Sequence, residues 1–131
     1  MRFLGIDYGK KRVGVALSDE GGVMAFPYTV LPNSRSLADR VSALCKEKAV
    51  DAVVVGLSQT STGVDNPITK DVDRFVNTLT ERTELPFHLE PEFYSTQEAL
   101  RVQGRTGHTD ASAAAIILQR FLDKENAPDP S

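Results

Sequence analysis

Over the first quarter of the chain, hydrophobic and polar positions alternate with a period of two, which is the pattern of β-strands. The alternation covers residues 3–7 and 13–17, and a turn-forming segment at 18–22 leads to a third apolar stretch over 23–31. This pattern predicts three consecutive antiparallel strands. Pro27 has no backbone N–H to donate, so the third strand is expected at an edge of the sheet.

Further along the chain the apolar spacing becomes helical, and helices then alternate with strands. Leu37, Val41 and Cys45 share one helical face behind candidate caps at Asn33, Ser34 and Ser36. The same patterns predict a strand over 52–55 closed by Gly56, a helix over 68–79, a short strand over 86–89, a short helix over 95–102 and an alanine-rich helix over 110–123. The expected order is βββαβαβαα, an α/β fold with a mixed five-stranded sheet and helices on both faces.

The composition fits one domain of ordinary size. The chain has 131 residues, of which 40% are hydrophobic and 25% charged. We expect a single domain over residues 1–123, followed by a disordered polar tail over 124–131. No apolar run is long enough for a membrane span, and Asp7 interrupts the first apolar segment too early for a signal peptide.

The charge and the cysteine content narrow the functional classes. Cys45 is the only cysteine, so we expect no internal disulfide and a cytoplasmic protein in which this side chain is buried. The formal net charge is -3. This excludes a protein whose whole surface attracts nucleic acid, so a polyanionic partner would have to be met by a local basic patch.

Three acidic residues stand at the ends of predicted elements. Asp7 ends an apolar strand, Glu92 follows the short strand in a loop, and Asp110 starts the last helix on the same stripe as Ala114. Each has a simpler structural explanation: a turn hydrogen bond, a solvated loop side chain and a helix cap. If the three carboxylates converge at one end of the sheet, however, they would repel one another unless hard divalent cations bind there.

These residues lie in segments that resemble the YqgF/RuvX family of the ribonuclease H-like superfamily. Residues 4–16 resemble the family's opening motif, and 53–57 resemble its central strand. Glu92 with 95–99 resembles its acidic loop, and 110–115 its last helix. The resemblance covers nearly the whole chain and implies a ribonuclease H-like fold.

The resemblance also implies a metal-dependent nuclease. Its substrate would be the 5′ end of pre-16S rRNA in ribosome biogenesis or, as the alternative, a four-way DNA junction. Asp7, Glu92 and Asp110 match the family's acidic triad, which would hold two Mg²⁺ or Mn²⁺ ions, with Asp7 bridging them, for phosphodiester hydrolysis. A junction resolvase needs a symmetric dimer, whereas a monomer can trim an RNA end, so monomer and homodimer both stay open.

Cationic residues near the acidic ones are candidates for phosphate contacts. They are Lys10, Lys11, Arg12, Arg101, Arg105 and His108. Exposed Lys and Arg also serve solubility alone, and the two histidines of the chain lack the spacing of a zinc site. His108 is a further candidate for proton transfer, against the simpler interpretation of a loop histidine.

Two other functions compete with the nuclease. Residues 5–9 also resemble the first phosphate motif of the actin-like ATPases and sugar kinases, although those sites are built between two domains. A non-catalytic RNA- or ribosome-binding module is the other alternative. It is motivated by Pro91 and Phe93, which flank Glu92 where the family usually has Asp and Arg. A further departure from the family is Ser58, which stands in place of a proline.

Overall fold

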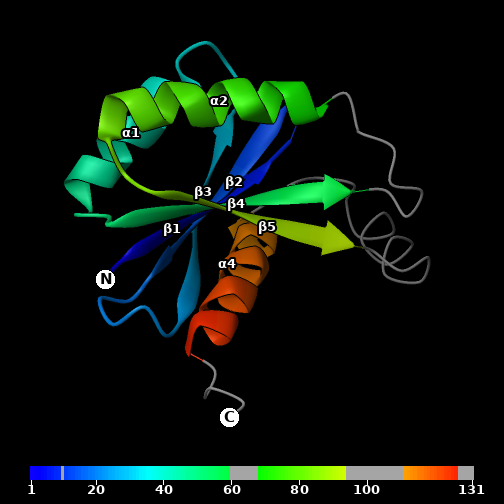
Figure 1. The fold of residues 1–131 in the computed structure, drawn as a ribbon. Coiled ribbons are helices and arrows are strands. Elements are labelled where there is room, and N and C mark those ends of the chain that lie inside the picture. Colours follow the sequence, from blue (N-terminus) through cyan, green and yellow to red (C-terminus); the bar gives the residue numbers. More distant parts are fainter. Residues whose placement is uncertain (10, 60–67, 94–110, 127–131) are drawn as a thin grey trace.

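A mixed five-stranded sheet forms the centre of the structure (Figure 1). The computed structural model describes residues 1–9, 11–59, 68–93 and 111–126. The elements are β1 (Phe3–Tyr8), β2 (Arg12–Ser18), β3 (Ala25–Pro32), α1 (Leu37–Glu47), β4 (Ala52–Gln59), α2 (Ile68–Thr83), β5 (Phe87–Phe93) and α4 (Ala111–Asn126). The expected short helix over 95–102 and the polar loop after it lie outside the described residues.

The strand order is β3-β2-β1-β4-β5. β1, β4 and β5 are parallel, whereas β2 is antiparallel to both β1 and β3. The ends of β1, β4 and β5, the start of β2 and the end of β3 therefore share one edge of the sheet, which we call the carboxyl edge. The predicted mixed sheet is confirmed. β3, which contains Pro27, is an outermost strand of the sheet, as predicted.

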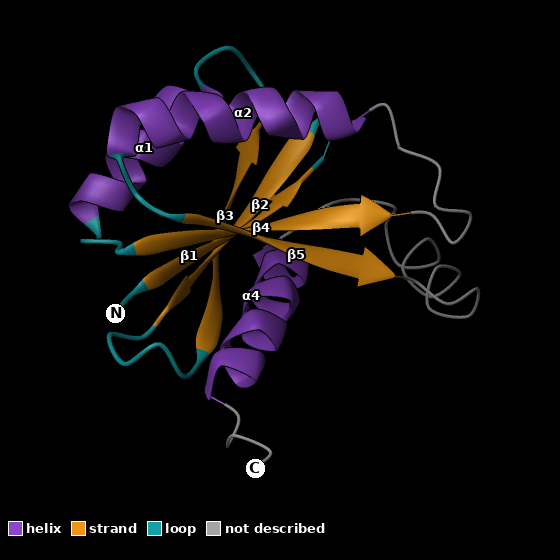
Figure 2. Ribbon diagram, in the orientation of Figure 1, coloured by secondary structure: helices purple, strands orange, loops and turns teal. Residues whose placement is uncertain are grey.

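The helices cover both faces of the sheet, as predicted (Figure 2). α1 and α2 lie on one face over a core that includes Ile6, Val53 and Val55. α4 lies on the opposite face over a second core that includes Ala16 and Val54. None of the helices in the described part of the chain has a stretch apolar and long enough to span a bilayer.

Two strands are longer than predicted. β4 continues past Gly56 to Gln59, and β5 continues past Leu89 to Phe93. Pro91 lies within β5, which is an edge strand, where a missing backbone N–H need not break a ladder. Glu92 therefore lies within β5, and the prediction that places it in a loop is wrong.

The last helix is also longer than predicted. It continues through Asn126, so the boundary after residue 123 is placed three residues too early. The side-chain amide of Asn126 donates to the carbonyl of Gly22, and Lys124 forms an ion pair with Glu90. These contacts hold a segment that composition alone assigns to the tail, while residues 127–131 lie outside the described part of the chain.

Cys45 is buried, as expected. Burial disfavours the thiolate and raises the pKa of the Cys45 thiol to about 11. The thiol is therefore protonated at neutral pH, as expected for a core side chain.

Candidate active site

Asp7 is a buried carboxylate at the carboxyl edge. Its relative exposure is 8%, and it lies on the face of the sheet covered by α4. Its Cα partners are Gly14 in β2 and Gly56 in β4, so neither neighbouring strand has a side chain beside it. An ionised carboxylate is costly to bury without favourable partners, so this position calls for a polar or cationic counterpart.

Glycine allows α4 to approach this part of the sheet closely. A Cβ atom at Gly5 would lie 2.7 Å from Cβ of Leu118 and 3.1 Å from the carbonyl oxygen of Ala114. A Cβ atom at Gly56 would lie 2.5 Å from Cδ1 of Ile117. β1 and β4 thus present bare backbone where the helix crosses them.

The direction of α4 places its first turn toward the carboxyl edge. Ala114 lies over Gly5, whereas Phe121, further toward the C-terminus of α4, packs against Phe3 with ring centroids 5.7 Å apart. Moving from Phe3 to Gly5 along β1 therefore corresponds to moving toward the N-terminus of α4. Asp7 continues this direction, so the first turn of α4, which begins at Ala111, lies toward the end of β1 that contains Asp7.

β5 contributes two acidic positions at successive places on one face. Glu90 is the Cα partner of Gly56, in the same row as Asp7, and Glu92 is the partner of Ser58 one step further toward the carboxyl edge. Glu90 is 5% exposed and pairs with Lys124 of α4. Its charge is therefore compensated within the fold, which the sequence analysis did not anticipate.

The remaining predicted site residues divide into two groups. Lys11 and Arg12 are exposed at the start of β2, on the same sheet edge as Asp7. The rest lie outside the described residues: Lys10, Arg101, Arg105, His108, Asp110 and the side chain of Glu92. Among the predicted acidic triad, the structure therefore places the side chain of Asp7 and the backbone of Glu92.

The oxygen chemistry of these residues suits a hard divalent cation. Carboxylates of Asp and Glu are the usual protein ligands of Mg²⁺ and Mn²⁺. Within the described residues, no three His, Cys, Asp or Glu side chains come together around a common point. Asp7 nevertheless provides a buried carboxylate at the edge where the backbone of Glu92 also lies, and carboxylate oxygens suit such an ion.

Asn33 holds the turn that follows Asp7, a role that the sequence analysis missed. Its side-chain amide donates to the carbonyl of Gly9 at 2.7 Å, and its backbone N–H donates to the carbonyl of Lys11 at 2.9 Å. Asn33, Ser34 and Ser36 were the candidate caps, and the N-cap of α1 is Ser36, without a side-chain cap bond. Asparagine satisfies local backbone in both roles, so its residue type alone cannot separate them.

We expect Asn33→Ala to lower the free energy of unfolding by about 1 kcal/mol, because it removes a hydrogen bond to the carbonyl of Gly9. Hydrogen exchange of the amides over 8–12 should accelerate by more than that of the core of β1. Urea unfolding and exchange mass spectrometry measure the two effects. Asn77→Ala is the matched control, since Asn77 is exposed on α2 and makes no side-chain hydrogen bond within the described residues. Equal effects of the two substitutions would contradict the role of Asn33.

Comparison with known families and proteins covers almost the whole chain. The family model described as RuvX, Holliday junction resolvase, matches residues 1–124. A protein of Nitratidesulfovibrio vulgaris (strain DSM 19637 / Miyazaki F) named "Putative pre-16S rRNA nuclease" is 44% identical over 133 residues, which cover 94% of each chain. A protein of the same name from Thermoanaerobacter pseudethanolicus is 35% identical and covers 95% of this chain and 98% of its own.

Solved structures share the fold at low sequence identity. Thermus thermophilus RuvC in complex with Holliday junction substrate has a TM-score of 0.58 at 18% identity, covering 97% of this chain and 96% of its own. The Fowlpox virus resolvase in complex with substrate Holliday junction DNA has a TM-score of 0.60 at 9% identity, covering 96% and 99%. The expected ribonuclease H-like fold is confirmed.

Proposed function

The chain belongs to the RuvX family, and from this premise we propose that it is a nuclease that hydrolyses phosphodiester bonds at the carboxyl edge with divalent metal ions. The observation that carries this proposal is the buried carboxylate of Asp7 at the end of β1, between Gly14 and Gly56. An acid in that position gains nothing from burial for packing, and it suits a cationic ligand.

Asp7, Glu92 and Asp110 would hold the ions, which we propose are two Mg²⁺ or Mn²⁺. When bound, such ions stabilise developing charge on the phosphate and make water a better nucleophile. Asp7 is fixed within the ladder of β1, which gives its carboxylate a defined position relative to the strand ends. Glu90, in the same row of the sheet, is paired with Lys124, so we do not include it among the proposed ligands.

The cationic residues of the turn between β1 and β2 would hold the substrate. Lys11 and Arg12 are exposed at the carboxyl edge, where they can contact phosphates on either side of the bond that is cleaved. Such contacts position the backbone without reading its sequence. Lys10, Arg101, Arg105 and His108 remain further candidates for the same role, and His108 also for proton transfer.

For the substrate, we propose the 5′ end of pre-16S rRNA, because the curated relatives carry that name at up to 44% identity. A four-way DNA junction is the second candidate, favoured by the description of the family model. The first function suits a monomer, whereas the second requires a dimer. The site of action would be the cytoplasm, where the buried, protonated Cys45 is compatible with a reducing environment.

The direct test is to incubate the wild-type protein with labelled pre-16S rRNA and with a four-way DNA junction, each with Mg²⁺, Mn²⁺ or EDTA. We expect metal-dependent cleavage of the RNA at its 5′ end and little cleavage of the junction. The opposite substrate preference would identify a resolvase. Binding of either substrate without cleavage, by a folded protein, would contradict the nuclease function. It would support the alternative of a non-catalytic RNA- or ribosome-binding module.

A further inference from the structure

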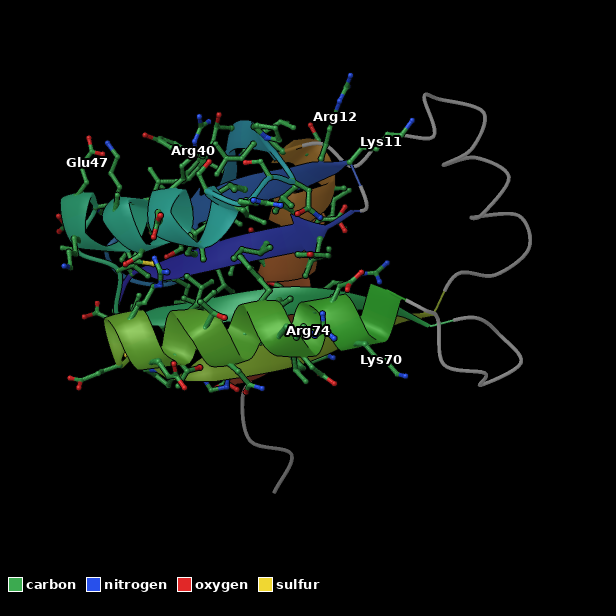
Figure 3. The ribbon with its side chains drawn as sticks, turned by 90° about the horizontal axis from the view of Figure 1, so that it is seen from above. Lys11, Arg12, Arg40, Glu47, Lys70 and Arg74 are labelled. Carbon is green, nitrogen blue, oxygen red and sulfur yellow. The ribbon has the colours of Figure 1, made fainter. Side chains whose placement is uncertain are left out.

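Four exposed cations form a strip that starts beside the candidate active site. They are Lys11, Arg12, Arg35 and Arg40, and we call them the basic strip. Figure 3 shows Lys11, Arg12 and Arg40 pointing outward along the side of the molecule formed by β2 and α1, with Lys70 and Arg74 on α2. Neither Arg35 nor Arg40 belongs to the residues so far assigned to the substrate.

The strip is continuous with the edge that contains Asp7. Arg12 is the Cα partner of Pro32, the last residue of β3. The loop before α1 therefore begins next to the turn between β1 and β2. The backbone N–H of Asn33 donates to the carbonyl of Lys11, which ties that loop to the turn. Arg35 lies in this loop, and the backbone N–H of Arg40 donates to the carbonyl of Ser36 in the first turn of α1.

The charge of the strip is not neutralised by the fold. None of its four members forms an ion pair within the described residues. Asp39, an acid of α1 that lies between Arg35 and Arg40 in sequence, pairs instead with Arg82 of α2. From Lys11 to Arg40 the side chains available to an anion are therefore cationic, whereas Glu47 is an exposed acid at the far end of α1 (Figure 3).

The two cations on α2 have a different setting. Lys70 and Arg74 are one helical turn apart, but Asp71 and Asp73 are exposed on the same two turns. Neither acid forms an ion pair within the described part of the chain, so the two signs balance locally. This ridge resembles the mixed surface that keeps an ordinary helix soluble.

We propose that the basic strip binds the phosphate backbone of the nucleic acid substrate, so that the strand leaves the active site over the turn between β1 and β2 and the start of α1 rather than over α2. This inference rests on the proposed function and adds the path of the substrate to it. In a protein with a net charge of -3, an uncompensated strip of this kind provides the local attraction that the overall charge does not.

The test compares two double variants that change the charge equally. Arg35→Gln with Arg40→Gln removes the distal half of the strip, and Lys70→Gln with Arg74→Gln is the matched control on α2. The probe is a fluorescein-labelled pre-16S rRNA fragment that contains the 5′ cleavage site, with Ca²⁺ in place of Mg²⁺ and its integrity checked on a gel. Fluorescence anisotropy gives Kd between about 50 and 200 mM salt, and thermal melting verifies that both variants are folded.

We expect the strip variant to bind about tenfold or more weakly at the middle of this range. The slope of log Kd against log salt should become shallower by about 1.4 to 1.8, because each lost phosphate contact changes the slope by about 0.7 to 0.9. The α2 variant should keep the wild-type slope. These two results together would support the proposed path.

Other outcomes distinguish failure of the proposed basic strip from failure of the proposed nuclease activity. An unchanged slope in the strip variant, or an equal change in both variants, would overturn the strip while wild-type cleavage still supported the nuclease. A protein that binds with the expected strip dependence but never cleaves would refute the nuclease and support the strip. A wild-type protein that binds neither the RNA nor a four-way junction would overturn both.

Discussion

Asp7→Asn should reduce metal-dependent cleavage by at least about 100-fold, since even residues that only support metal ligands typically cost 10- to 100-fold when changed. The substitution keeps the size of the side chain but removes the negative charge that would hold the ions. The loss should therefore accompany weaker Mn²⁺ binding, measured by calorimetry, while the circular dichroism spectrum stays that of the wild type. Cleavage rates are compared under single-turnover conditions with the substrate that the wild type cleaves.

Asp51→Asn provides the matched control for this experiment. Asp51 precedes β4 at the opposite end of the parallel strands, and Oδ2 of its carboxylate accepts the backbone N–H of Arg2 at 2.9 Å. An asparagine oxygen can still accept that bond, so the control changes one charge far from the carboxyl edge. Full cleavage by Asp7→Asn would remove Asp7 from the active site, and an equal loss in Asp51→Asn would show that the effect is not local.

Gly5→Ala should lower the free energy of unfolding by about 1–3 kcal/mol, the usual range for forcing a methyl group into a packed core. The added Cβ would meet Cβ of Leu118 at 2.7 Å and the backbone oxygen of Ala114 at 3.1 Å. Neither atom is the far end of a flexible side chain, so α4 itself must shift. Because Asp110 directly precedes this helix, kcat/KM for cleavage should fall as well.

Gly21→Ala makes the same chemical change without the clash. The atoms nearest to a Cβ at Gly21 are 3.8 Å away, and its backbone is not left-handed. This variant should be neutral or gain up to about 0.4–1 kcal/mol, because alanine restricts the unfolded chain. Urea unfolding of the two variants should therefore give opposite signs, and a Gly5→Ala protein as stable as Gly21→Ala would contradict the close helix approach.

Much of the fold could be predicted because the hydrophobic period differs sharply between its elements. Alternation identified β1 and β2, helical spacing identified α1 and α2, and Pro27 indicated an edge. Asp7 could be singled out for the same reason, since a carboxylate on an apolar strand face contradicts the pattern around it. These signals are local, so a single sequence is enough to reveal them.

The features that the sequence did not reveal depend on contacts between distant segments. β5 continues through Pro91 because it is an edge strand, and its position in the sheet depends on the pairing of distant segments. Lys124 was predicted to belong to a polar tail, because the sequence does not show that it pairs with the buried Glu90. Asn33 was one of three candidate caps, and its hydrogen bond to the carbonyl of Gly9 depends on the turn after β1 lying beside it.

The arrangement of the two cores has a consequence for how the chain is synthesised. Within the described residues, α4 alone covers its face of the sheet, and the second core forms only when Ile117, Leu118 and Phe121 reach Val54 and Ala16. A nascent chain that has emerged only as far as β5 therefore exposes that apolar face while its other core can already assemble. Exposed sheet faces of this kind favour aggregation, so chaperone demand should peak shortly before the last helix leaves the ribosome.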